Sequence, residues 1–356
     1  MPGAYGVLVA LGIDEVVARR YLAPVKSRVA LVVFGAVVAC TSGASTSSPA
    51  VTTVPPSLSV SASVSPSASP DGAITVDVPR PADLVAAFGS VWVQARGDGS
   101  LVRIDRMGRV TARISDAAFV HRTGRFGAPS SALADGYGSI WSLKEGALVR
   151  VDPSSDRVVD TVRMRAPWAV AAGEGAVWVV YGSGRVNLMR IDPSTMHAEH
   201  FVSIGTSAKA FGVGDGYLWW LAFSEGGGMY RIDPRTARTR FLPVGYNQRF
   251  IVPTPRWVWL VDSGYAQRID PTDGSLVDAR ADQKAKRSIG VSYSDGTIWM
   301  NSGTAVGFDA GSGEVTARVP ALTHVKYWSS GGIARLGRRV WLADPHGDRV
   351  VGVSLA

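Results

Sequence analysis

Gly175-Ala176-Val177-Trp178-Val179, followed by Arg190-Ile191-Asp192-Pro193, is one copy of a motif that recurs through most of this chain. Each copy has a small residue, Val or Ile, a Trp and an apolar residue, then a Gly-rich turn and a form of Arg-Ile-Asp-Pro. The tryptophans of the copies are Trp92, Trp141, Trp178, Trp219, Trp259, Trp299 and Trp341, spaced 49, 37, 41, 40, 40 and 42 residues apart. Such a period indicates seven copies of one structural unit.

Each unit predicts four short strands. In the second unit they cover 133–134, 139–143, 147–151 and 157–162, and the turns between them are rich in Gly, Asp, Ser and Pro. No segment shows a helical period. Four strands in about 40 residues are typical of a propeller blade. The sequence therefore predicts an all-β fold, a seven-bladed β-propeller of four-stranded blades, with the repeated tryptophans packed between blades.

The two ends of the repeat region are complementary. The seventh unit ends at Ala356 after its third strand, so one outer strand is missing. Ahead of the first unit, the segment from Ile74 to Val78 alternates apolar and polar residues. We expect a strand at about 73–79 to complete the last blade and close the ring, which removes an open sheet edge. The predicted propeller domain is 73–356.

The N-terminal region reads as a targeting segment. Lys26 and Arg28 precede an apolar run of signal-peptide length that ends at Cys40. The run is too short to span a bilayer, which needs about 20 residues. The segment before this run is long for a signal peptide, so a translation start later than Met1 is an alternative. Val37-Val38-Ala39-Cys40 resembles a bacterial lipobox, which implies that Cys40 is lipidated, and a plain secretory signal with an incidental cysteine is the alternative.

We therefore assign 1–39 to the targeting segment and 40–72 to a lipidated cysteine followed by a disordered linker. The linker is rich in Ser, Thr and Pro, has no aromatic residue and has one charge, Asp71, so it cannot form a core. The expected location is the outer face of the cell membrane, held by the lipid anchor, or outside the cell if Cys40 is not lipidated.

Composition excludes several kinds of site. Cys40 is the only cysteine and precedes the repeats, so the domain has neither a disulfide framework nor a thiolate metal site. The net charge of +8 comes from basic residues scattered through the repeats, which does not favour nucleic-acid binding. We expect a monomer without a cofactor.

The repeats resemble those of bacterial propellers with YVTN-like or streptogramin-lyase-like units, over about 73–356. For streptogramin lyases this resemblance implies a histidine and a metal-bound acidic residue over the central channel. Their repeats carry a Trp-Phe-Thr-Glu strand, whereas this chain has Trp141-Ser142-Leu143-Lys144 or Trp178-Val179-Val180-Tyr181 at that place. We transfer no catalytic residue, because one propeller scaffold supports many functions.

The candidate ligand-binding residues are expected around one mouth of the channel, where the loops between blades lead into the innermost strands. Trp168, Lys209 and Arg249 stand ten residues before their tryptophans, with Arg287 nearby, and Arg125 lies in an insertion at 116–130. Cations bind carboxylate or phosphate and an indole stacks on a ring, so this collar suits an anionic or sugar-like ligand. The alternative for the collar is that it only solvates the channel. The alternative for the insertion is that it is a tolerated loop. The equivalent positions in the other blades are Ala82, Ser131, Ile289 and Gly331.

The last blade holds the candidate catalytic residues. His324 lies in the loop before it, and Asp344, His346 and Asp348 lie in its second turn, on the same face. Two imidazoles with carboxylates can perform acid–base chemistry or hold a metal, although isolated loop histidines are usually only solvated.

The function that the sequence favours is a non-catalytic binding or protein-interaction module that acts through its channel-mouth face. Its partner would be a protein or a small anionic or sugar-like ligand, and it would contact the membrane only through its lipid anchor. One alternative is a streptogramin-lyase-like lyase or hydrolase that uses a divalent metal. Another is the sensor domain of a signalling system, which a neighbouring kinase or regulator gene would indicate.

Overall fold

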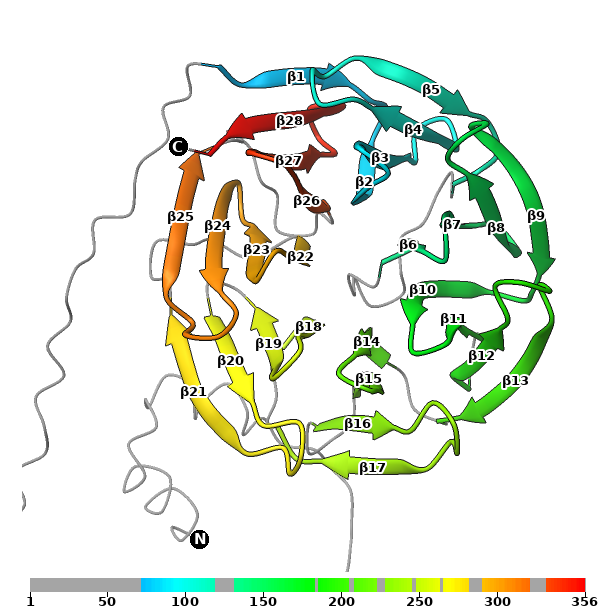
Figure 1. The fold of residues 1–356 in the computed structure, drawn as a ribbon, viewed down its shortest axis with the longest axis vertical. Helices are drawn as coiled ribbons and strands as arrows, with labels where there is room; N and C mark the ends of the chain where they lie inside the picture. The colour runs from blue at the N-terminus through cyan, green and yellow to red at the C-terminus, as the bar shows by residue number, and fades with distance from the viewer. Residues whose placement is uncertain are drawn as a thin grey trace, which may run out of the picture. The chain divides into compact units, whose positions relative to one another are not determined.

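The computed structural model describes residues 72–118, 131–182, 185–204, 208–222, 228–244, 248–262, 265–281, 290–320 and 331–355. These residues form strands and turns only, and none of them lies in a helix that is long and apolar enough to cross a membrane. The strands assemble into seven four-stranded antiparallel sheets arranged as the blades of a ring (Figure 1). The predicted seven-bladed β-propeller is confirmed.

Six blades are built from consecutive strands, with the first strand innermost (Figure 1). In blade 2 the observed strands begin at the predicted residues and end one or two residues later. The strands are β1 (Ile74–Asp77), β2 (Pro81–Ala87), β3 (Ser90–Ala95), β4 (Ser100–Ile104), β5 (Val110–Ile114), β6 (Leu133–Gly136), β7 (Ser139–Lys144), β8 (Ala147–Asp152), β9 (Arg157–Arg163), β10 (Pro167–Gly173), β11 (Ala176–Tyr181), β12 (Asn187–Ile191), β13 (Ala198–Ser203), β14 (Ala208–Gly214), β15 (Tyr217–Ala222), β16 (Gly228–Ile232), β17 (Thr239–Leu242), β18 (Phe250–Pro253), β19 (Val258–Asp262), β20 (Tyr265–Ile269), β21 (Leu276–Ala281), β22 (Gly290–Ser294), β23 (Thr297–Asn301), β24 (Thr304–Asp309), β25 (Val315–Pro320), β26 (Ile333–Leu336), β27 (Arg339–Asp344) and β28 (Arg349–Ser354).

The ring closes as the sequence predicts. Blade 7 has the strand order β1-β28-β27-β26, so β1 from the start of the domain is its outer strand (Figure 1). Ile74 to Asp77 pair antiparallel with Gly352 to Arg349. Val76 and Val78 are buried in the same apolar cluster as Trp341. Because one blade combines both ends of the repeat region, it fastens the first blade to the last.

The seven repeated tryptophans form the layer between blades. Each is at most 2% exposed, which confirms their predicted structural role. Trp178, for example, donates its indole N–H to the carbonyl of Gly173 at 2.9 Å and packs edge-on against Phe201. A buried indole fills a large volume and needs one hydrogen-bond partner. The same N–H bond, to the carbonyl five residues earlier, is made by Trp92, Trp141 and Trp219.

Arginines of the repeat connect neighbouring blades. In the first five blades an arginine on the third strand lies opposite the tryptophan, as in the pair Trp92 and Arg103. The Arg103 guanidinium lies 5.0 Å from the Trp92 ring centre and donates to the carbonyl of Pro153 in the next blade at 2.8 Å. Equivalent bonds to the next blade come from Arg150, Arg231 and Arg268. The Arg-Ile-Asp-Pro motif therefore holds the ring together as well as forming a turn.

The aspartate of this motif shapes the turn that follows. The Asp192 carboxylate accepts the backbone N–H groups of Ser194 and Thr195, and hydrogen bonds from Ser194 lower its pKa. Aspartates form such turns readily because their short side chain reaches the backbone two residues on. The pKa values of Asp105, Asp152, Asp233 and Asp309 are lowered for the same reason. The repeated Asp is thus a turn former.

Candidate functional site

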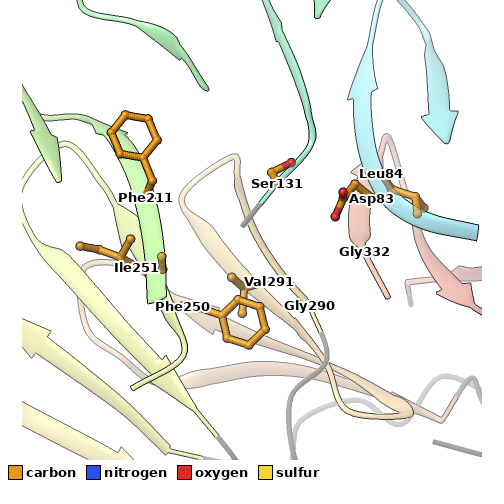
Figure 2. A pocket seen from close by; sticks show the side chains of 10 residues that line it. Asp83, Leu84, Ser131, Phe211, Phe250, Ile251, Gly290, Val291 and Gly332 are labelled. Atoms are coloured by element: carbon orange, nitrogen blue, oxygen red, sulfur yellow. The ribbon is translucent and has the colours of Figure 1, made fainter. Parts of the chain in front are cut away.

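A cavity lies between the innermost strands, near the ends at which they begin, and Figure 2 shows the side chains that line it. Its volume is about 110 Å³. The lining comes from β2, β14, β18 and β22 and from the residues just before β6 and β26. Figure 2 shows Phe211 and Ile251 on one side of it and Asp83 and Leu84 on the other. Six of the seven blades therefore contribute to one small site.

Three of the innermost strands have a register irregularity near their first residues. The pairing skips from Pro167 to Ala169 in β10 and from Ala208 to Ala210 in β14, which leaves Trp168 and Lys209 out of register. In β2 it skips from Pro81 to Leu84. An extra residue in a strand bends it and re-aims a side chain, and such bulges are common beside binding sites. The irregularities therefore all fall at the channel mouth.

In blade 1 the residues that line the cavity are Asp83 and Leu84, and Asp83 is the polar one. Its carboxylate accepts a hydrogen bond from the Arg96 guanidinium at 3.2 Å and from the Ala132 backbone N–H at 3.0 Å. The expected mouth residue Ala82 is buried instead, at 2% exposure. The expectation assumed one fixed distance from each tryptophan, and the two residues between Pro81 and Leu84 break that spacing. Asp83 is thus a site residue that the sequence did not reveal.

Trp168 connects the mouth to the cavity wall through other aromatic rings. It is half-buried and lies edge-on to Trp220, with ring centres 5.8 Å apart. Trp220 in turn lies edge-on to Phe211, with ring centres 6.3 Å apart, and Phe211 lines the cavity. Edge-on aromatic pairs at these distances are attractive beyond the area that they bury. This row gives the mouth a rigid apolar side.

Lys209 and Arg249 occupy the same place in the next two blades. Each directly precedes a cavity-lining residue, Ala210 and Phe250 respectively. The Arg249 guanidinium lies 5.8 Å from the ring centre of Phe250. Burial lowers the pKa of the Lys209 ammonium, and the Asp262 carboxylate opposes this shift. Trp168, Lys209 and Arg249 thus stand at the entries of the innermost strands of three successive blades, while Arg287 and Arg125 lie outside the described residues.

Two of the candidate catalytic residues, Asp344 and Asp348, make contacts that stabilise blade 7. Asp344 is 2% exposed and pairs with the Arg349 guanidinium at 3.0 Å. Asp348 accepts the backbone N–H of Arg80 at 2.7 Å, beside the closing strand. His346 is exposed in the turn, and His324 lies outside the described residues. Within the described ranges, no group of three His, Cys, Asp or Glu residues can hold a metal ion.

Two buried amides illustrate how polar groups between blades are used structurally. Gln94 donates to the carbonyls of Ala132 and Leu143 in blade 2. Asn301 makes the equivalent contact from blade 6, donating to carbonyls of Gly331 and Ala343 in blade 7. Both side chains are fully buried, and their amide groups donate hydrogen bonds to backbone carbonyls of the next blade. Each lies two residues after its repeated Trp, a position that is apolar in the other five units.

Comparison with known proteins supports the fold. No protein-family model and no curated protein sequence matches the chain. Solved structures that resemble it include a streptogramin B lyase, with a TM-score of 0.61, 14% identity, and coverage of 80% of this chain and 97% of that one. Virginiamycin B lyase from Staphylococcus aureus matches with a TM-score of 0.60 and 14% identity, covering 80% and 99%.

A third structure, the β-propeller domain of Cps50 (Swd1) from Myceliophteria thermophila, matches equally well. Its TM-score is 0.61 at 13% identity, and the match covers 80% of this chain and 98% of that domain. Proteins with different names thus match the same blades at very low identity. The resemblance to streptogramin-lyase propellers therefore holds for the fold, and function has to be argued from the site.

Proposed function

We propose that this protein is a binding module that recognises its ligand at the channel mouth and performs no chemistry on it. The observation that supports this most directly is the cavity, because its walls come from six blades and two of its lining residues, Ala210 and Phe250, directly follow Lys209 and Arg249 in the sequence. Ligand sites are concave and have a few polar groups that set the orientation of the ligand. A rigid ring that places several side chains around one hollow has this form.

The lyase alternative has less support in the described residues. Asp344 and Asp348 are engaged in an ion pair and in a backbone contact, and both contacts hold the closing blade. The resemblance to lyase structures at 14% identity concerns the fold. A metal-dependent reaction at His346 and His324 stays open as an outcome of the experiment below. A protein partner at the same face and a sensor role are compatible with the binding module.

The proposal predicts ligand-dependent stabilisation that requires the mouth residues. A screen of sugars, cell-wall fragments, macrocyclic peptides, organic anions and divalent metals should raise the melting temperature with at least one compound. A ligand at 100 times its Kd stabilises the native state by about 2.7 kcal/mol. The shift should disappear in Lys209→Ala and Trp168→Ala. It should persist in Arg235→Ala. This variant removes an exposed charge from the turn between β16 and β17 of blade 4, on the face opposite the channel mouth.

Two results of this screen would contradict the proposal. A shift with divalent metal alone, lost in His346→Ala, would favour the lyase. A ligand whose effect survives both mouth variants would place recognition elsewhere on the propeller.

We also propose that the domain acts outside the cytoplasm on a lipid tether. The support is the lipobox-like Val37-Val38-Ala39-Cys40 and the Ser-, Thr- and Pro-rich linker that follows it, both of which lie outside the described residues. Expression in a bacterium fed with labelled fatty acid should label the wild-type protein and leave Cys40→Ala unlabelled. Wild type should sediment with membranes, since a diacylated N-terminal cysteine provides stable anchoring. Labelling of Cys40→Ala, or unlabelled soluble wild type, would refute the tether.

A further inference from the structure

The turn between β4 and β5 of blade 1 differs from the equivalent turns of the other blades. In blades 1 to 6 the residue two positions after the motif aspartate donates its backbone N–H to that carboxylate. In blades 2 to 6 this residue is polar, charged or glycine, namely Ser154, Ser194, Arg235, Thr272 and Gly311. In blade 1 it is Met107, which is 69% exposed and is the most exposed large apolar side chain in the described part of the chain.

Arginines and a second apolar residue flank Met107. Arg106 and Arg109 stand on either side of Met107-Gly108, and both are exposed. Val110, the next residue, is 43% exposed. The Asp105 carboxylate already pairs with the Arg109 guanidinium at 2.7 Å and accepts the Met107 N–H. The turn therefore presents cations and apolar side chains together to the solvent.

The first turn of blade 7 lies beside this turn. The Arg339 guanidinium donates to the carbonyl of Arg106 and to the hydroxyl of Ser354, each at 3.1 Å. The Leu355 N–H donates to the carbonyl of Arg338 at 2.8 Å, and the Arg338 side chain is exposed. Blade 7 therefore adds a further exposed arginine to those of blade 1. We call Arg106, Met107, Arg109, Val110 and Arg338 together the basic apolar surface.

The propeller domain also begins at the basic apolar surface. The side chain of Ile74 packs over Gly108, at a place where a Cβ would not fit. Ile74 pairs with Gly352 near the end of β28 and lies two residues after Gly72, the first described residue. The proposed linker therefore joins the domain here. A flexible linker of about 30 residues spans about 30 Å on average, so a lipidated Cys40 would keep this surface close to the membrane.

We propose that the basic apolar surface rests on an anionic lipid bilayer, with Met107 and Val110 in the headgroup region and the arginines against lipid phosphates. Arginines are attracted to an anionic surface within a Debye length, and apolar side chains beside them enter the interface. This inference rests on the proposed tether and adds an orientation to it. Arg338 follows the end of β26, whereas the innermost strands begin at the channel mouth. The mouth therefore faces away from the membrane.

The test places a fluorophore at the tip of the turn. In the full chain with Cys40→Ala, Met107→Cys provides one thiol for an environment-sensitive nitrobenzoxadiazole dye. Thr272→Cys, at the equivalent position of blade 5, is the matched control. The vesicles contain phosphatidylcholine alone or with an equal part of phosphatidylglycerol. We expect a blue shift and quenching by nitroxide-labelled lipid only for the dye at position 107 on anionic vesicles.

The apolar run before position 40 is present in every sample. Attachment through this run would therefore affect both dyes alike, and the comparison between them reports contact of the propeller surface. The contact should also weaken as salt is added, because salt screens the exposed charges.

Charge variants assign the contact to residues. Arg106→Gln combined with Arg338→Gln should weaken it about 25-fold in a vesicle titration, because each arginine near an anionic surface strengthens association about fivefold. Both side chains are exposed, and the hydrogen bonds to their backbone carbonyls remain in the variant. Arg235→Gln combined with Arg238→Gln lowers the net charge equally in the turn of blade 4 and should leave the contact nearly unchanged.

Four results would contradict this inference. The surface makes no specific contact if the two dyes respond equally, or if neutral and anionic vesicles give the same signal. An equal loss in the blade 4 variant would assign binding to net charge. A shift with soluble polyphosphate but not with vesicles would identify a polyanion partner instead of a membrane.

The fatty-acid experiment separates this inference from the tether. Labelled Cys40 without lipid contact at position 107 would leave the tether standing and refute the membrane-facing surface. Lipid contact at position 107 without labelling of Cys40 would support the surface and refute the tether.

Discussion

A chain that lacks residues 1–79 should lose most of its cooperative stability, whereas a chain that lacks only residues 1–71 should unfold like the full protein. The difference between them is β1 with its flanking residues. Val76 and Val78 are 6% and 0% exposed, and burial of a valine contributes about 1.5–3 kcal/mol. The pairing with β28 and the bond from the Val78 N–H to the Asp348 carbonyl add to this.

The loss would be large relative to the stability of a typical domain, which is about 5–15 kcal/mol. Without β1, β28 also becomes an open edge of blade 7, and exposed edges promote aggregation. Unfolding in urea followed by circular dichroism measures the effect. Addition of a synthetic peptide of residues 72–80 should restore part of the stability by pairing with β28. Equal midpoints for the two truncations would show that the ring does not depend on this strand.

Replacement of Trp178 by alanine should destabilise the propeller by about 3–5 kcal/mol, the usual cost of removing a large aromatic side chain from a core. Trp178 is fully buried between blades 3 and 4, in a cluster with Leu188, Leu218 and Trp220. Its loss leaves a cavity and also removes the hydrogen bond to Gly173. Guanidinium unfolding gives the free energy directly.

Trp168→Ala is the matched control, since it removes the same side chain from the mouth of the same blade. Trp168 is half-buried, and one of its contacts is the edge of Trp220. We expect a loss of about 1 kcal/mol from this variant, together with loss of ligand binding. If the two variants cost the same free energy, the repeated tryptophans would have no special part in the layer between blades.

The fold was predictable because its information is local and repeated. Each repeat unit specifies two strands and two turns through one motif: a small residue, Val and Trp, followed by a Gly-rich turn and Arg-Ile-Asp-Pro. Seven copies of this motif specify the ring. Even the closing strand follows from the alternation at Ile74 to Val78 and from the missing strand after β28.

For the candidate site, the sequence predicted positions along the chain. The spacing from each tryptophan placed Trp168, Lys209 and Arg249 at the entries of the innermost strands, as observed, and their role in binding stays a prediction. The same rule failed in blade 1, where the pairing skips to Leu84 and Asp83 takes the position expected for Ala82. Whether a strand forms a bulge depends on which residues the neighbouring strand and blade can accommodate. The distance from the repeated tryptophan does not show this.

The sequence by itself determined the fold class, the number of blades, the closure of the ring and the tryptophan layer, because each of these follows from strand and turn patterns within about 40 residues. The tertiary structure decided which side chains meet across blades. It brings Asp83 to Ala132, Gln94 to blade 2, and Phe211 to the cavity that Phe250 and Val291 complete. These contacts join residues that are 38 to 80 positions apart, and the packing of the blades in the ring fixes their distances and the volume left between them.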